Sequence, residues 1–218
     1  MIKTKPGFTL AEVAMSLTVI GVIAAMLIPQ LVRNTQGNQT GALLGRVVEQ
    51  IALGNQNYIQ YINLENTSQT NVLGMMDDFH ENRYRTRIPT FWGLEQPELP
   101  VASVLPLRNF DGTEADEIFE EKIITNGHLF KTSRLSAGIS YFEPNNLNPM
   151  DGEDDDTGVE VYIDTTGWDK GPNIFGRDIF AFHLINNGTL KPFNGNDAIN
   201  GLELTERVVR DGFKITYN

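Results

Sequence analysis

The sequence MIKTKPG, residues 1–7, is followed directly by FTLAEVAMSLTVIGVIAAMLI, residues 8–28. This junction between a polar leader and a long apolar stretch is the most informative feature of the sequence. The second stretch has 21 residues and one charged side chain, Glu12. An α-helix of that length, rising about 1.5 Å per residue, spans about 30 Å, the thickness of a bilayer's hydrocarbon core. The preceding Lys3 and Lys5 predict that the short leader stays in the cytoplasm and that the rest of the chain lies outside.

Three interpretations of this region compete. A cleaved secretory signal has a shorter apolar core and a small-residue site after it, whereas Pro29 and Gln30 follow here without an A-x-A pattern. A plain membrane anchor explains the length but not Glu12, because a carboxylate within a bilayer is costly and usually has a partner. The third interpretation is cleavage before the apolar stretch. It keeps the stretch on the mature chain and creates an α-amino group, the natural partner of a desolvated carboxylate.

The segment GFTLAEV, residues 7–13, resembles the prepilin signature, G-F-T-L-x-E followed by a long apolar run. The chain is thus similar to the type IV pilin-like and type II secretion pseudopilin family. The resemblance implies that prepilin peptidase cuts after Gly7 and N-methylates Phe8. It also implies that Glu12, the fifth mature residue, neutralises the N-terminus of a neighbouring subunit during docking. Pro29 matches a helix-disturbing proline that many pilins carry.

The resemblance implies that the protein is a structural subunit of a type II secretion pseudopilus or a type IV pilus. Its expected partners are further copies of itself, prepilin peptidase, the inner-membrane assembly platform and the membrane. Before assembly the chain would cross the inner membrane once, with its leader cytoplasmic and its head outside. It would then enter a periplasmic pseudopilus or a cell-surface pilus. The alternative is a minor or tip pilin that acts as a binding module for adhesion or substrate recognition.

The stretch after Pro29 predicts the second half of a long helix. Apolar residues recur at spacings of three and four between Leu44 and Ile62, which is typical of an amphipathic helix, and Asn55 interrupts their face. We therefore expect one helix from Phe8 to about Leu64, bent near Pro29. Its membrane-spanning half is 8–28, and its amphipathic half, 29–64, packs on a globular domain.

Three glycines, Gly37, Gly41 and Gly45, recur every four residues and so lie on one face of this helix. They fit either a close helix contact, or a zone that stretches on assembly, or helix breakers in a linker. The last interpretation is favoured, because each glycine costs about 1 kcal/mol in a helix.

Residues 65–218 predict an α+β head domain, a pilin-like arrangement in which the N-terminal helix packs on a C-terminal antiparallel sheet. Asn187-Gly188 is a strong hairpin signal. Two helices are expected, near 75–84 and over 114–125, the second entered through Asp111-Gly112-Thr113 and stopped at Gly127. Strands are expected at 129–132, 139–143, 159–164, 179–185, 189–193 and near 213–217.

Two further segments extend the resemblance. LSAGISYF, residues 135–142, is similar to the L-x-D-G-x-x-x-F strand of many pilin-like proteins, with Ala137 in place of the usual aspartate. Residues 161–182, VYIDTTGWDKGPNIFGRDIFAF, resemble a D-x-N-G-x-K-G-P-N-x-x-G-x-D-x-F segment of bacterial pseudopilin-like proteins, with Thr166 in place of asparagine. This second resemblance favours the pseudopilus over the pilus.

Clustered carboxylates suggest calcium, which takes six to eight oxygen ligands. The acidic run at 151–156 lacks the spacing of an EF-hand and fits a solvated turn. The second candidate is Asp164, Asp169, Asn173 and Asp178, a set that some secretion pseudopilins make plausible because they bind calcium in a C-terminal loop. A Gly-Pro-Asn turn at 171–173, formed without metal, explains the same residues.

Other classes of function are disfavoured. The formal net charge of −11 argues against a nucleic-acid surface, which needs clustered Lys and Arg. The chain has no cysteine, and its histidines, His80, His128 and His183, show no metal-ligand spacing. Neither a G-x-S-x-G elbow nor a phosphate-binding loop is present, so we expect that the protein is not an enzyme.

Overall fold

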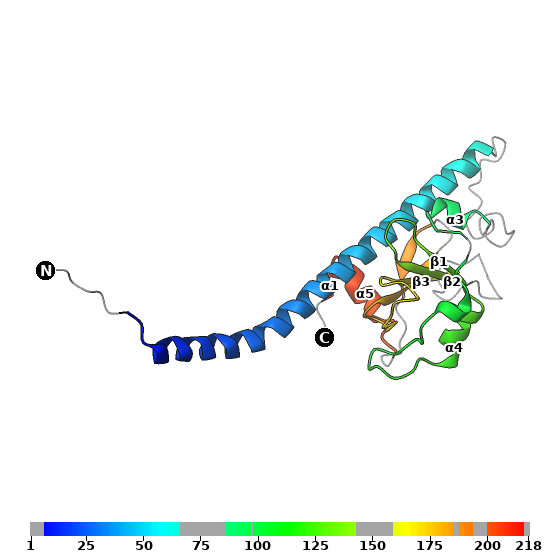
Figure 1. Ribbon diagram of the computed structural model, residues 1–218. Helices are drawn as coiled ribbons and strands as arrows, with labels where there is room; N and C mark the ends of the chain where they lie inside the picture. The colour runs from blue at the N-terminus through cyan, green and yellow to red at the C-terminus, as the bar shows by residue number, and fades with distance from the viewer. Residues whose placement is uncertain are drawn as a thin grey trace.

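A single long helix dominates the architecture. The computed structural model describes residues 7–65, 86–96, 98–142, 159–184, 188–193 and 200–215. Helix α1 (Leu10–Glu65) has 56 residues and extends far beyond the head domain (Figure 1). Pro29 lies inside the helix without ending it, and the axis curves gradually over the first half of α1. The predicted helix is confirmed, and its bend is a curve rather than a break.

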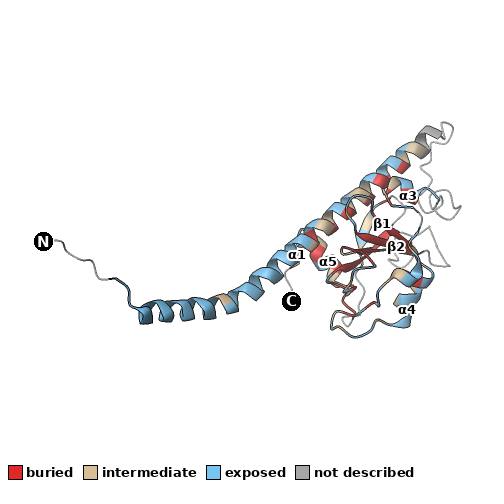
Figure 2. Ribbon diagram, viewed as in Figure 1, coloured by how far each residue is buried: buried red, intermediate tan, exposed pale blue. Residues whose placement is uncertain are grey.

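The second half of α1 packs on the head, as its apolar spacing predicts. Leu44, Val47 and Ile51 are fully buried and Tyr58 nearly so, whereas almost all of the first half is exposed (Figure 2). Short elements of the head complete this contact, among them α3 (Ile88–Phe91). The η1 turn (Val101–Ser103) follows α3 in the chain.

The glycines of α1 mark a close contact between the helix and the C-terminal segment. A Cβ added at Gly41 would overlap the carbonyl group of Phe213, and one at Gly37 would lie 3.0 Å from the carbonyl oxygen of Ile215. At Gly45 an added Cβ would come within 3.2 Å of the Phe213 ring. The helix continues through all three positions, so the favoured interpretation as helix breakers in a linker is wrong.

The head contains one antiparallel sheet in the order β1-β2-β3-β4-β5. Each strand pairs with the next along the chain, which confirms the α+β layout and five of the six predicted strands to within about a residue or two at each end. Leu184 pairs with Leu190 across the predicted hairpin, whose Gly188 has φ 78°, while Asn187 lies outside the described residues. The strands are β1 (His128–Lys131), β2 (Gly138–Phe142), β3 (Val159–Asp164), β4 (Ile179–Leu184) and β5 (Leu190–Pro192).

Both faces of the sheet are covered. Alternate strand residues such as Val161 and Phe182 belong to the apolar cluster that α1 covers. Their neighbours Tyr162 and Ala181 belong to a second cluster on the opposite face, with Trp168 and Phe175. Figure 1 shows α1 and α4 on opposite sides of the sheet. This double cover explains why all six residues of β4 are buried.

Two predictions in the head need correction. The helix expected over 114–125 begins later, as α4 (Glu117–Glu120), and continues as the π-helical η2 (Glu121–Thr125). Asp111 accepts hydrogen bonds from the N–H and hydroxyl of Thr113, 2.9 and 2.6 Å long, so it closes its own turn instead of capping that helix.

The strand expected near 213–217 is wrong in its described part. The chain instead forms α5 (Leu204–Arg210), which the sequence analysis missed, and Phe213 then has φ 60°, incompatible with a strand. Thr205 and Val208 are the buried residues of α5, three positions apart on one face. The helix expected near 75–84 and residues 216–218 lie outside the described residues.

Candidate functional sites: the uncovered helix and the β3–β4 loop

The first half of α1 is an uncovered apolar surface. Phe8 and Leu10 are 88% and 89% exposed, and the large apolar side chains from Val13 to Val32 are exposed as well. By length and composition α1 can cross a membrane, although a signal sequence passes the same test. Apolar area gains about 25 cal/mol per Å² when it leaves water, so this surface calls for lipid or other helices around it.

Glu12 closes a capping box at the start of this helix. The N–H and hydroxyl of Thr9 donate to Glu12 Oε2 over 2.8 and 2.9 Å, and the Glu12 N–H lies 3.3 Å from Thr9 Oγ1. This is the reciprocal S/T-x-x-E arrangement that satisfies free N–H groups at a helix start. The Thr-x-x-Glu spacing at 9–12 is visible in the sequence, from which we expected for Glu12 only a partner in another subunit.

Gly7 and Phe8, the residues on either side of the predicted cleavage, precede α1 and are exposed in non-helical chain. No heavy atom lies within 4 Å of a Cβ added at Gly7. No described residue of the head therefore crowds Gly7, and the peptide bond between the two residues lies before the start of α1.

Asn55 joins the second half of α1 to the head. Its side chain is 1% exposed, its Nδ2 donates to the carbonyl oxygen of Gly188 over 2.7 Å, and its Oδ1 accepts from Trp92 Nε1 over 2.7 Å. Gln50 adds a hydrogen bond from Nε2 to the Trp92 carbonyl oxygen. Directional bonds from one buried amide to two parts of the head fix the rotation of α1, and so the direction in which its first half leaves the head.

The β3–β4 loop brings together three of the four residues predicted to bind metal. Asp164 ends β3 and Asp178 directly precedes β4, and both are buried, as is Asn173. Thr166 Oγ1 lies 2.8 Å from Asp164 Oδ1 and 3.4 Å from Asp178 Oδ2, which places the two carboxylates close together. Asp169, the fourth residue, is exposed and does not join them.

Backbone N–H groups hold both carboxylates. Asp164 Oδ1 accepts from the N–H groups of Thr166 and Gly167, and the two oxygens of Asp178 accept from those of Asn173 and Ile174. Burial, together with the negative charge of Asp178, raises the pKa of Asp164 to about 7. Burial likewise raises the pKa of Asp178.

The remaining candidates from the sequence, the acidic run and the three histidines, either lie outside the described residues or make ordinary side-chain contacts. The acidic run at 151–156 and His80 lie outside the described residues. His128 Nδ1 lies 3.1 Å from Glu98 Oε1, and the ring of His183 stacks on Phe193. Among the described residues no group of three or more His, Cys, Asp or Glu side chains is placed to hold a metal ion.

Comparison with known proteins finds no similar one: no family model, no curated protein and no solved structure matches the chain. Fold and sites together define an α+β protein in which a long N-terminal helix has one half covered by the head and the other half uncovered.

Proposed function

We propose that the chain is a pilin-like filament subunit that is inserted in the inner membrane, cleaved after Gly7, and assembled through the first half of α1. The observation that carries the proposal is the uncovered apolar segment 8–32, which projects beyond a head that has a buried core of its own (Figure 2). A bilayer covers such a helix before assembly, and a bundle of identical helices covers it afterwards.

Glu12 gives this surface a preferred register. It is the only charged residue between Phe8 and Val32. On insertion scales a charged residue at the centre of a membrane helix costs about 2.5–3.5 kcal/mol. The bonds from Thr9 satisfy one carboxylate oxygen, Oε2, and leave the negative charge in place. In a filament the Phe8 amine of one subunit neutralises Glu12 of another, and this favours one axial position of neighbouring helices over the others.

The uncovered apolar segment also explains why cleavage would occur before it rather than after it. Cleavage after Gly7 removes the two lysines of the leader and retains the whole apolar segment, which a filament core needs. The curve of α1 in its first half, where Pro29 lies, allows heads to sit at an angle to that core (Figure 1).

The test is the intact mass of the protein extracted from membranes of a host that carries its prepilin peptidase. We expect loss of residues 1–7, one added methyl group, and the same species in filaments sheared from cells. A mature protein that retains Met1, or that begins after Ile28, would contradict the proposal.

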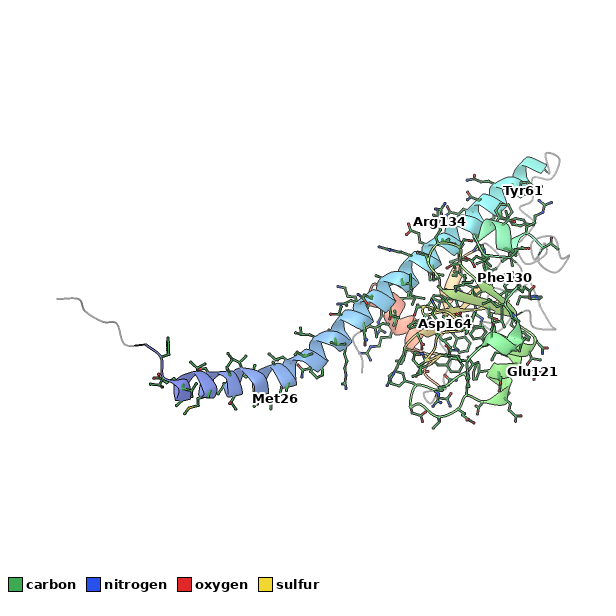
Figure 3. All side chains as sticks on the ribbon, in the orientation of Figure 1. Met26, Tyr61, Glu121, Phe130, Arg134 and Asp164 are labelled. Carbon is green, nitrogen blue, oxygen red and sulfur yellow. The ribbon has the colours of Figure 1, made fainter. Side chains whose placement is uncertain are left out.

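A groove beside α1 supports the second candidate function, a minor or tip subunit that binds a ligand. The groove has a volume of about 810 Å³ and lies between α1, α3 and the turn after β1, with Arg46, Glu49 and Arg134 as its charged residues. Figure 3 labels Arg134 on the side of the head next to α1. Abundance separates the two functions, because a major subunit greatly outnumbers every other protein in sheared filaments, whereas a tip subunit is rare.

A further inference from the structure

The base of the head lies next to the uncovered half of α1. It consists of residues 203–215, which include α5, and it lies against α1 where the helix leaves the head (Figure 1). A Cβ added at Gly37 would lie 3.0 Å from the carbonyl oxygen of Ile215, and one at Gly41 would overlap the carbonyl group of Phe213. If α1 spans a bilayer, as the proposed function requires, this base faces the membrane surface.

The length of α1 sets the distance between this base and the lipid. With residues 8–28 in the hydrocarbon core, Arg33 comes five residues later, about 7.5 Å along the helix. The headgroup layer on each side of a bilayer is about 5–8 Å thick, so Arg33 lies at its outer part. Gly37, and with it the base of the head, follows about 6 Å further along the helix. The long side chains of basic residues can reach over such a distance to the headgroups.

Basic side chains gather at this level of the molecule. Lys214 and Arg33 are exposed, and the side chains of Arg207 and Arg210 are 47% and 68% exposed. Neither Arg33 nor Lys214 forms an ion pair with a described residue. Their positive charges are therefore available to a negatively charged partner outside the chain.

The acidic residues of the base only partly offset these charges. The Asp211 carboxylate lies between two arginines, 3.9 Å from Arg207 Nε and 3.7 Å from Arg210 Nε. Glu203 has its Oε2 buried, which leaves Glu206 as the fully exposed acid. With Arg33, the base thus has four basic and three acidic residues, whereas the whole chain has 17 basic and 28 acidic ones. Its balance of charge is opposite to that of the chain and suits an anionic surface.

We propose that, while α1 spans the membrane, the base of the head binds the phosphate groups of anionic phospholipids through Arg207, Arg210 and Lys214, beside Arg33. Guanidinium and ammonium groups donate strong, charge-assisted hydrogen bonds to phosphate oxygens. Each basic residue close to an anionic surface favours binding about fivefold. This contact holds the head close to the bilayer before assembly, and a subunit that enters a filament has to release it.

The experiment measures how fast Lys214 is acetylated in the full-length protein. The protein is placed in nanodiscs of phosphatidylcholine alone, or of phosphatidylcholine with phosphatidylglycerol, and is treated with an uncharged N-hydroxysuccinimide ester. Mass spectrometry follows each lysine, and the exposed Lys170 of the β3–β4 loop is the internal reference. We expect Lys214 to react about fivefold more slowly in the anionic nanodiscs, and Lys170 at the same rate in both. In 1 M NaCl, where charge interactions reach only about 3 Å, the difference should disappear.

Two double variants identify the side chains that are responsible. Arg207→Gln with Arg210→Gln removes two basic residues from the base and should let Lys214 react in anionic nanodiscs nearly as fast as in zwitterionic ones. Arg87→Gln with Arg134→Gln is the matched control, because it removes two exposed arginines near α3 and in the turn after β1. The control should keep the slow reaction of Lys214. All four arginines are exposed, so both double variants should fold.

The proposal fails if Lys214 reacts at the same rate in both kinds of nanodisc, because the lipid charge would then play no part. It also fails if the slow reaction persists without Arg207 and Arg210, or if both double variants lose it equally, which would show a diffuse charge effect. Insertion of α1 is measured separately, by co-purification of the protein with the nanodiscs. A protein that does not insert contradicts the proposed function, whereas one that inserts without these differences in rate contradicts only the lipid contact.

Discussion

The two halves of α1 differ in what covers them, although both are rich in apolar residues. In the second half the apolar side chains follow one face, and the head covers that face. In the first half apolar side chains surround the helix, and no described part of the head covers them. One polar side chain in each half stands out: that of Asn55 bonds to the head on two sides, whereas the carboxylate of Glu12 accepts its hydrogen bonds from Thr9, three residues away. The first half thus offers an apolar surface for contacts outside the chain, and the second half makes its contacts within it.

The largest expected effect comes from removing the charge of Glu12. Glu12→Gln keeps a capping box, because glutamine also serves at this position, but leaves the neighbour's Phe8 amine without a counter-charge. An unpaired buried charge costs about 3–5 kcal/mol, so the yield of sheared filaments should fall roughly tenfold or more. Cleavage after Gly7 and insertion in the membrane should persist, as shown by intact mass and membrane fractionation.

Thr9→Ala is the matched control, since it removes the threonine hydroxyl from the capping box and keeps the carboxylate. It should assemble far better than Glu12→Gln. If Thr9→Ala loses filaments and Glu12→Gln does not, Glu12 matters for the helix start and the charge-pair account is wrong.

Removing Asn55 tests the other half of the comparison. Asn55→Ala leaves Trp92 Nε1 and the Gly188 carbonyl oxygen without the bonds that Asn55 now supplies in the interior. Each buried polar group that loses its bond costs about 1–3 kcal/mol, so the head should lose about 2–4 kcal/mol of unfolding free energy in denaturant titration. Gln56→Ala, at an exposed neighbour, should change it by less than about 0.5 kcal/mol. Equal effects of the two would show that Asn55 is not the fixing contact.

The pH dependence of the head should be opposite to that of a paired carboxylate. The pKa of Asp164 is about 7 in the folded protein and near 4 when unfolded, so folding takes up a proton between these values. Without divalent cations, the stability contributed by this proton is fully present below about pH 4 and is lost as the pH rises through about 7, at a cost of a few kcal/mol. The melting temperature of Asp164→Asn should therefore exceed that of the parent by more at pH 8 than at pH 5 in chelator. A difference that does not change with pH would refute the assigned pKa.

The smallest effect is expected at the glycines. Gly41→Ala places a Cβ on the Phe213 carbonyl group, and the strain of about 1–3 kcal/mol outweighs the gain of up to 1 kcal/mol in helix propensity. Gly21→Ala, in the uncovered half, has no heavy atom within 4 Å of its new Cβ and should leave the melting temperature of the head unchanged. If both glycines tolerate alanine equally, the close contact with the C-terminal segment is absent.

Local patterns in the sequence predicted much of the fold. The spacing of apolar residues predicted α1, and period-two alternation with turn residues predicted β3 from Val159 to Asp164. The clustering of Asp164, Asp169, Asn173 and Asp178 in the sequence predicted one common site. It could not show that Asp169 is exposed while the other three residues are buried, because burial depends on the folded head.

What the sequence did not show depends on contacts between distant segments. From the sequence, the glycines of α1 were interpreted as helix breakers. The structure shows instead that they make room for Phe213 and Ile215, which pack against them. Helix α5 is only 7 residues long, and its buried Thr205 does not count as an apolar residue in the spacing pattern that predicts a helix. Only the fold shows why Thr205 is buried: its hydroxyl accepts a hydrogen bond from the Ala181 N–H of β4 over 3.1 Å. Asn55 interrupts an apolar face in the sequence, and only the folded head supplies its two partners.

The contact at Gly37 also has a consequence for how the protein is handled. Because the carbonyl oxygen of Ile215 would lie 3.0 Å from a Cβ at Gly37, the segment up to Ile215 lies where α1 leaves the head. A bulky label attached to this segment, for example at the exposed Lys214, would therefore be held near the base of the uncovered helix, where neighbouring subunits of the proposed filament would have to fit. Labels for assembly assays belong instead on an exposed side chain far from that base, such as Glu121, which Figure 3 labels beyond the opposite face of the sheet.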